Sequence, residues 1–190
     1  MTRIIAGRAK GRRLATPKGT DTRPTSDRVR EALFSAVESW CGTLVDQRVL
    51  DLYAGSGALG LEAWSRGAGA VTWVEADRRT TTVIAANARS IGFDSGDVRS
   101  GSVASVLGRG ATSPYHLVLS DPPYFLPTAD VVTDLELLRD HGWLAPDALV
   151  VVERPTRGDP LTWPEGYTPR SERRYGETML WSALRTGPVV

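Results

Sequence analysis

The chain has 190 residues, of which 41% are hydrophobic and 24% are charged, and its net charge at pH 7 is +1. These values are typical of one soluble domain with a full hydrophobic core, and the single cysteine excludes an internal disulfide. No apolar run is long enough to span a membrane, and the first residues lack the apolar stretch of a signal peptide. We therefore expect a cytoplasmic protein that does not bind membranes.

The charges are distributed unevenly along the chain. Residues 1–30 hold nine basic and two acidic side chains, a net charge of +7, whereas the rest of the chain holds 14 basic and 20 acidic side chains, a net charge of −6. A basic segment attached to an acidic body favours a polyanion such as nucleic acid as the partner. The alternative is a solvated and disordered basic tail.

The basic segment has its own predicted secondary structure. Residues 3–7 and 12–16 are short predicted strands around a turn rich in glycine and lysine, which predicts a small β-hairpin extension over residues 1–22. A helix follows, with Thr25 or Ser26 as its N-cap. Its apolar side chains recur at helical spacing and form one face, and its basic side chains are expected to lie largely off that face.

From residue 48 onward, predicted strands and helices alternate. The strands are expected near residues 48–53, 70–75, 97–100, 115–120 and 148–153, and the helices near residues 57–66, 78–91, 102–108 and 128–139. Such alternation predicts an α/β fold with a parallel sheet covered on both faces. Two further strands around Gly176 would form a C-terminal antiparallel hairpin and complete a mostly parallel seven-stranded sheet, in a domain that spans residues 23–190.

A glycine-rich stretch joins the first of these strands to a helix. Gly55, Gly57 and Gly60 match the pattern G-x-G-x-x-G, in which glycines permit a tight turn and a close approach of a ligand. Glu75 follows twenty positions after Gly55, at the end of the next predicted strand, where a carboxylate would accept hydrogen bonds from ribose hydroxyls. The pattern predicts a nucleoside cofactor and leaves NAD and S-adenosylmethionine open.

A second motif follows the strand at residues 115–120. Its members are Asp121, Pro122, Pro123 and Tyr124. Ligands of open α/β sheets bind at the carboxyl ends of the strands, so this motif and the glycine loop should face the same crevice. The Asp121 carboxylate and the Pro122 carbonyl can accept the hydrogens of an exocyclic amine while Tyr124 stacks on its base. The alternative is a rigid turn without a ligand.

These motifs carry a resemblance to a known family. Residues 51–57 followed by residues 121–124 resemble the class I S-adenosylmethionine-dependent methyltransferases that modify amino groups. Residues 3–7, 10–14, 23–34 and 55–63 narrow this to the RsmD family, which methylates N2 of one guanine in 16S rRNA. The resemblance implies a Rossmann-like class I methyltransferase fold, S-adenosyl-L-methionine as cofactor, and 16S rRNA or the small ribosomal subunit particle as partner.

The resemblance also implies roles for individual residues. Asp121, Pro122, Pro123 and Tyr124 would hold the target guanine. The residues that would bind the cofactor are Asp51, Tyr53, Ala54, Gly55, Ser56, Gly57, Glu75, Ala76, Ser102 and Val103. Ser102 departs from the superfamily pattern, which often has an acid there. No metal is needed for this chemistry, and we expect a monomer.

The side chains of the basic segment would bind the phosphates of the RNA. The residues expected to do so are Arg8, Lys10, Arg12, Arg13, Arg23, Arg28 and Arg30. Arginines in the C-terminal part of the chain would extend this RNA-binding surface. These are Arg154, Arg157, Arg170, Arg173 and Arg174.

Several other functions share parts of this pattern. A nicotinamide oxidoreductase has the glycine loop but no use for the motif at residues 121–124. A DNA adenine-N6 or cytosine-N4 methyltransferase uses the same motif but usually carries a larger target-recognition region. A protein-glutamine methyltransferase typically has Asn where Asp121 stands. A non-catalytic ribosome-assembly factor is the remaining alternative.

Overall fold

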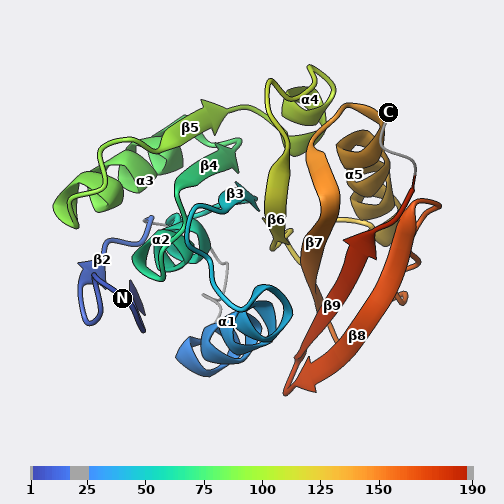
Figure 1. Ribbon diagram of the computed structural model, residues 1–190, viewed down its shortest axis with the longest axis horizontal. Helices are drawn as coiled ribbons and strands as arrows, with labels where there is room; N and C mark the ends of the chain where they lie inside the picture. Colours follow the sequence, from blue (N-terminus) through green and yellow to red (C-terminus); the bar gives the residue numbers. More distant parts are fainter. Residues whose placement is uncertain (1, 18–25, 188–190) are drawn as a thin grey trace.

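The computed structural model describes residues 2–17 and 26–187, which form two sheets and five helices (Figure 1). A small antiparallel sheet consists of β1 (Thr2–Arg3) and β2 (Arg13–Leu14). The strands of the large sheet are β3 (Arg48–Leu52), β4 (Ala70–Glu75), β5 (Asp97–Ser100), β6 (Tyr115–Ser120), β7 (Leu144–Pro155), β8 (Tyr167–Tyr175) and β9 (Thr178–Arg185). The helices are α1 (Asp27–Cys41), α2 (Ala58–Ser65), α3 (Arg78–Ser90), α4 (Val103–Leu107) and α5 (Thr128–Asp140). None of these helices is both long and apolar enough to cross a membrane.

The large sheet has the strand order β5-β4-β3-β6-β7-β9-β8. Strands β3 to β7 are parallel, whereas β9 is antiparallel to both β7 and β8. The chain builds outward from β3 to β5 and then returns to place β6 on the other side of β3, so the order reverses between β3 and β6. The predicted Rossmann-like methyltransferase fold is confirmed, and this reversal is where such sheets bind ligands.

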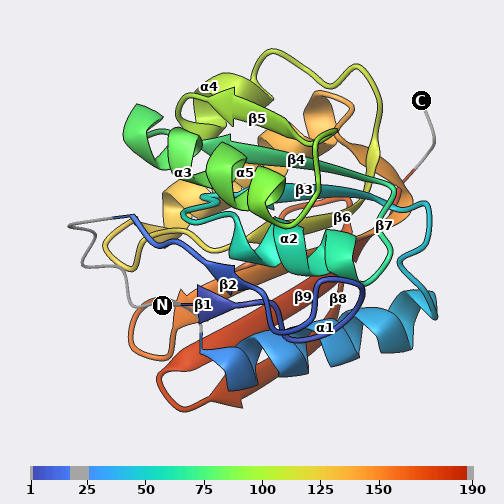
Figure 2. The same cartoon turned by 90° about the vertical axis from the view of Figure 1, so that its left-hand side faces the viewer.

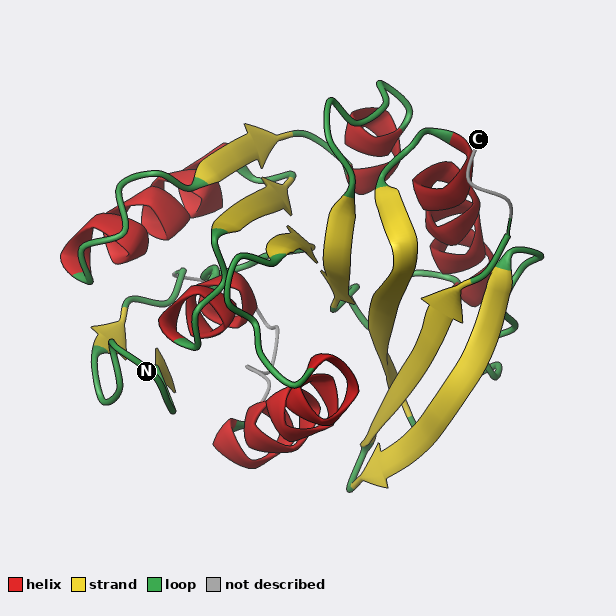
Figure 3. Cartoon of the chain, viewed as in Figure 1, coloured by secondary structure: helices red, strands yellow, loops and turns green. Residues whose placement is uncertain are grey.

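Helices cover both faces of the sheet (Figure 3). On one face, α1, α2, α3 and the N-terminal hairpin pack in one core cluster with Val49, Leu117 and Leu119. On the other face, α4 and α5 pack with Leu50 and Val118. Neighbouring residues of one strand therefore belong to opposite layers, as the alternation of side chains along a strand requires. Strands buried on both faces explain the continuous apolar runs in the sequence.

The N-terminal hairpin is shorter than predicted because part of its backbone bonds to a helix. Glu62 on α2 is fully buried, and its carboxylate accepts hydrogen bonds from the backbone N–H groups of Ile5, at 2.7 Å, and Ala6, at 3.0 Å. Ser65 accepts from the backbone of Ala9 at 2.9 Å and donates to Ala6 O at 2.6 Å. Figure 2 shows the hairpin lying against α2. The hairpin is thus packed into the domain, and its separation at residue 22 remains a prediction.

Glycine is required at the closest point of this contact. Gly7 has a φ of +79°, and a Cβ added to it would lie 1.9 Å from the backbone oxygen of Ser65. That oxygen also accepts a hydrogen bond of 2.8 Å from the N–H of Arg8. Any larger residue at position 7 would push the hairpin away from α2.

Asn87 on α3 links the end of the hairpin segment to the glycine loop. Its side chain is buried; its oxygen accepts from Ala15 N at 2.8 Å, and its nitrogen donates to Ala15 O and Ser56 O, each at 2.9 Å. One amide group therefore joins three parts of the chain.

Strand β7 is longer than the predicted 148–153. It starts at Leu144, which pairs with Tyr115 of β6, whereas pairing with β9 begins at Leu149. The register shift between Tyr115 and Leu117 accommodates Asp147, whose φ is +56°. A bulge of this kind hides the strand period in the sequence.

Candidate active site

The glycine loop lies at the carboxyl end of β3 and opens α2. Gly57 caps the helix with a φ of +78°, and a Cβ on Gly60 would lie 2.3 Å from the indole nitrogen of Trp73. These two glycines therefore permit close packing of α2 on β4. Gly55 differs, because its φ is +54° and an added Cβ would meet nothing within 4 Å. Its backbone is the part of the loop that a ligand can approach closely.

Asp51 lies beneath the loop. Its side chain is 1% exposed, and its Oδ2 accepts a hydrogen bond of 2.8 Å from Gly60 N. Burial raises the pKa of this carboxyl well above its usual value, although the Gly60 N–H opposes the shift. Oδ1 has no hydrogen-bond partner within residues 2–17 and 26–187. Asp51, predicted to bind the cofactor, is thus enclosed and acts on the loop through Gly60.

Glu75 joins the ends of two strands. It ends β4, is half-buried, and accepts hydrogen bonds of 2.9 Å from Gly55 N and Asp77 N. A carboxylate has about four acceptor positions, so two remain for the hydroxyls of a ribose. The half-exposed acid, the open Gly55 backbone and the adjacent loop fit a nucleoside cofactor.

The residues predicted near the adenine lie at the next two strand ends. Ala76 is exposed directly after Glu75, and Gly101 N donates to Glu75 O at 3.0 Å, which brings the end of β5 to the end of β4. Ser102 caps α4 by accepting from Ser105 N at 3.3 Å, whereas Val103 is buried. An adenine contact by Ser102 and Val103 stays a prediction.

Tyr53 is held in place by a residue that the sequence did not reveal. It has a φ of +58°, a conformation that is strained for a bulky residue, and its hydroxyl donates to Asp134 Oδ2 at 2.5 Å. Asp134 lies on α5 with 4% exposure, and burial raises its pKa to about 6. Burial and the neighbouring carboxylate likewise raise the pKa of Tyr53.

The motif at residues 121–124 lies directly beside the glycine loop. Ser120 pairs with Leu52 in the last register position of β6 and β3, and Asp121 N donates to Leu52 O at 3.4 Å. The carboxylates of Asp121 and Glu75 are both close enough to raise the pKa of Asp51. The structure therefore brings the two motifs together, as the sequence predicted.

Tyr124 and the loop around it are supported from β7 and β9. Its hydroxyl lies 3.2 Å from Thr178 Oγ1 and 3.5 Å from Glu153 Oε1. The ring itself is 47% exposed, and its pKa is raised chiefly by burial of the hydroxyl. Thr178 and the buried Glu153 are site residues that no local pattern marked.

Arg154 has a structural place in this site. The sequence predicts that Arg154 extends the RNA-binding surface, but Arg154 is 5% exposed and burial lowers its pKa. Its Nη2 donates to Leu126 O at 2.7 Å and its Nη1 to Pro123 O at 3.5 Å. Arg154 thus fixes the loop from below, and that part of the prediction is wrong.

Most of the predicted RNA-binding residues are exposed on the hairpin side. Arg8 lies over the ring of Trp64 at 4.9 Å, and Arg12 donates to the backbone oxygen of Ser90. The other exposed members of the set are Lys10, Arg13 and Arg28. Arg23 falls outside the residues that the structure describes.

Arg30 is not on this surface. It is 1% exposed, and its Nη2 donates to Asp27 Oδ1 at 2.7 Å and to Arg3 O at 2.9 Å. A guanidinium buried in this way is not available to a phosphate, so the prediction for Arg30 is wrong. The helical spacing of this segment predicts that Arg30 lies off the apolar face. In the structure, Arg30 is covered by the N-terminal hairpin, whose position cannot be read from the sequence.

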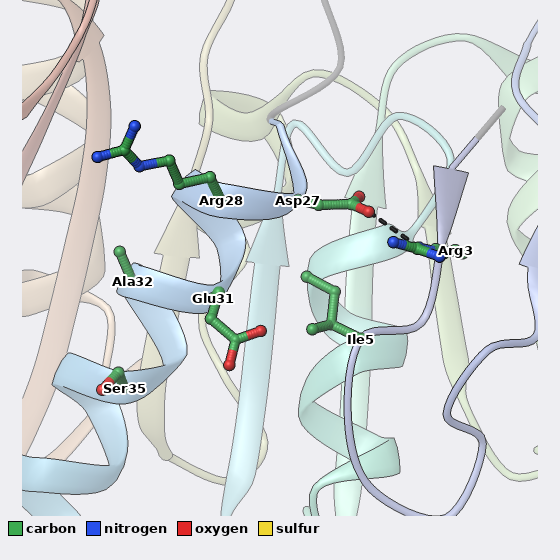
Figure 4. A pocket seen from close by; sticks show the side chains of 7 residues that line it. All are labelled: Arg3, Ile5, Asp27, Arg28, Glu31, Ala32 and Ser35. Carbon is green, nitrogen blue, oxygen red and sulfur yellow. Dashed lines mark hydrogen bonds and ion pairs between the residues drawn. The ribbon is translucent and has the colours of Figure 1, made fainter.

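A shallow depression of about 490 Å³ separates the hairpin from α1 (Figure 4). Arg3 on its wall pairs with Asp27 at 2.9 Å, whereas Arg28 extends away from this pair. Residues Ile5, Glu31, Ala32 and Ser35 complete the lining. Its two acids balance its two arginines, so the depression itself does not attract a polyanion.

Comparison with known proteins assigns the chain to one family. The model of the family described as "Conserved hypothetical protein 95" matches residues 2–183. Ribosomal RNA small subunit methyltransferase D of Escherichia coli strain K12 is 37% identical over 176 residues, which cover 92% of this chain and 85% of that protein. The chain belongs to the RsmD family of methyltransferases.

Other members agree with this assignment along the whole chain. The RsmD relative from Haemophilus influenzae is 35% identical over 92% of this chain and 89% of its own length. The solved structure of yhhF from Escherichia coli superposes with a TM-score of 0.84 at 35% identity, covering 97% of this chain and 98% of that one. The RsmD fold therefore includes both the N-terminal hairpin and the C-terminal strands.

Proposed function

We propose that this protein transfers the methyl group of S-adenosyl-L-methionine to the exocyclic N2 amino group of one guanine in 16S rRNA, in the cytoplasm. The RNA is either free or part of the small ribosomal subunit particle. The observation that carries the proposal is that the two loops leave the sheet side by side at the ends of β3 and β6, where Asp121 N bonds to Leu52 O, in a chain of the RsmD family. A nucleoside cofactor over Gly55 and Glu75 and a base at Asp121 would then share one crevice.

The chain's own groups would place the cofactor. Glu75 would accept hydrogen bonds from the ribose hydroxyls, and the open Gly55 backbone would let the donor lie against the loop. Tyr53 would form the side of the crevice nearest α5, since its hydroxyl is fixed on Asp134. When bound, the sulfonium supplies an activated methyl group, so no metal is needed.

The target amine needs orientation more than activation. The N2 lone pair of guanine is delocalised into the ring, which makes it a poor nucleophile. Acceptors on both amine hydrogens, the Asp121 carboxylate and the Pro122 carbonyl, would localise this lone pair and aim it at the methyl group. Positioning of this kind can lower a barrier by roughly 7–11 kcal/mol at best. Tyr124 would stack on the guanine, which must leave its RNA helix to reach the site.

Mass spectrometry of 16S rRNA nucleosides tests the proposal. RNA from cells that lack this protein is incubated with the purified protein and the methyl donor. We expect N2-methylguanosine at one position and no other new methylated nucleoside. N6-methyladenosine or N4-methylcytidine would instead support a methyltransferase that acts on the amino group of adenine or cytosine. Tight RNA binding without any transfer would support an assembly factor.

A further inference from the structure

Phe125 is the most exposed large apolar side chain in the described part of the chain. Its exposed fraction is 86%, and the other large exposed hydrophobic residues there are Val45, at 55%, and Tyr124, at 47%. Two of these three are therefore neighbours in the loop that follows β6. Apolar surface that stays exposed beside a crevice marks a contact surface for a ligand or partner.

The backbone that carries Phe125 is held rigidly. Leu126 N donates to Pro123 O at 2.9 Å, which closes a turn with Phe125 near its apex. The buried Arg154 donates to the carbonyl oxygens at both ends of the same turn. Prolines on both sides restrict the chain further. The ring is thus presented outward by a fixed support, and its exposure does not result from a loose loop.

The surroundings of this ring are suited to a nucleic acid strand. The hydroxyl of Tyr124 lies against Thr178, at the start of β9, so the turn between β8 and β9 borders the site. Arg173 and Arg174 are exposed at the end of β8 that enters this turn. Exposed arginines at a turn that borders exposed aromatic rings are typical of surfaces that hold single-stranded RNA.

We propose that Phe125 stacks on the nucleobase adjacent to the target guanine in the RNA strand. The proposal rests on the proposed function and adds a binding position for a second base. A guanine that leaves the stack deprives its neighbour of a stacking partner, and the ring of Phe125 replaces that partner. Tyr124 and Phe125, which are consecutive in the chain, then hold two consecutive bases of the RNA.

Matched variants of exposed apolar residues test this. Phe125→Ala removes the ring, Phe125→Leu keeps an apolar side chain without a π face, and Phe125→Trp restores stacking. Val45→Ala is the control, because Val45 precedes β3 whereas Phe125 follows β6, and parallel strands place these positions at opposite edges of the sheet. Because Phe125 is almost fully exposed, its replacement leaves no cavity and should not change the thermal unfolding midpoint.

The first measurement is the rate of methyl transfer to unmethylated 16S rRNA. Loss of one aromatic–base stack predicts a decrease in kcat/KM of about 10- to 100-fold for Phe125→Ala. We expect a similar decrease for Phe125→Leu, activity near that of the wild type for Phe125→Trp, and no change for Val45→Ala. The affinity for S-adenosyl-L-methionine should be unchanged in all four variants.

The second measurement detects stacking directly. Short single-stranded RNAs that contain one guanine carry 2-aminopurine on either its 5′ or its 3′ side. Stacking should quench the fluorescence of one of the two on binding to the wild type and to Phe125→Trp, but not to Phe125→Ala.

Each outcome decides a different question. If Phe125→Ala transfers methyl groups as fast as the wild type, the inference is overturned while the proposed function stands. Full activity of Phe125→Leu would also overturn stacking, since an aliphatic contact would then suffice. If the wild type binds the donor but methylates no rRNA, the proposed function itself fails. Quenching by the wild type that is lost in Phe125→Ala would then still show that Phe125 binds a base.

Discussion

The two regions that meet the ends of α2 differ in how fully the buried carboxylate of each is hydrogen-bonded. On the hairpin side, both oxygens of the buried Glu62 accept backbone hydrogen bonds, and Ser65 bonds to the backbone of Ala6 and Ala9. At the crevice, Tyr53 keeps a strained backbone, Asp51 Oδ1 has no partner in the described part of the chain, and Phe125 is left exposed. A strained bulky residue and an unpaired carboxylate oxygen beside it are local costs that a fold can retain where a ligand binds.

Replacing Asp121 by Ala should give the largest effect on activity. Without the carboxylate, the target amine loses an acceptor in the crevice, and we expect transfer to fall by at least about 100-fold, the scale of removing one positioned polar group. S-adenosyl-L-methionine binding, measured by calorimetry, should persist because Glu75 and Gly55 are untouched. Loss of donor binding in this variant would show that Asp121 serves the cofactor instead.

Glu62→Ala should be the largest disturbance of stability. It leaves two backbone N–H groups and the guanidinium of Arg66, which bonds Glu62 at 2.8 Å, without their buried acceptor. Breaking a buried charge pair costs about 3–5 kcal/mol, so denaturant unfolding should show a loss of that order. Glu38→Ala is the matched control, because Glu38 pairs with the same arginine but is exposed by 43%. Equal losses for both variants would contradict the special role of the buried carboxylate.

The pH dependence of stability should reveal Asp134. Its pKa is about 6 in the folded protein against an ordinary value of 3.8, so the folded state favours the protonated form. The stability gained from this is present below about pH 4 and is lost as the pH rises through about 6. Asp134→Asn mimics the neutral form. Between pH 4 and pH 8, its free energy of unfolding should therefore rise relative to that of the wild type by at most about 3 kcal/mol. Unfolding curves at both pH values would measure the difference, and a constant difference would contradict the assignment.

Arg28 and Arg30 provide the smallest and most selective test. Arg28 is exposed and should contact one phosphate, so Arg28→Ala should lower the slope of log K against log salt by about 0.7–0.9 and leave stability unchanged. Arg30→Ala should instead destabilise the fold, since Asp27 and the Arg3 carbonyl lose their buried donor. RNA binding titrations at several salt concentrations, with unfolding curves, separate the two roles. The reverse pattern would place Arg30 on the RNA.

Local sequence patterns predicted the features that depend only on residues close together in the chain. The glycine loop, the acid at the end of β4 and the motif after β6 lie where strand and helix periodicity placed them. The sequence missed contacts between distant residues. Tyr53 and Asp134 are 81 positions apart, and Arg154 meets the loop after β6 from another strand. An arginine or aspartate in an otherwise polar pattern looks like a surface charge until the fold shows what covers it.

The shared amide of Asn87 connects the segment after the hairpin to the glycine loop. Ala15 follows the basic hairpin, and Ser56 belongs to the glycine loop, yet both bond to the same planar group. A displacement of Ala15 would therefore shift the amide that also holds Ser56. If the hairpin binds RNA and the glycine loop binds the donor, as proposed, the two binding events would be coupled through Asn87, and a substitution at this position should weaken both.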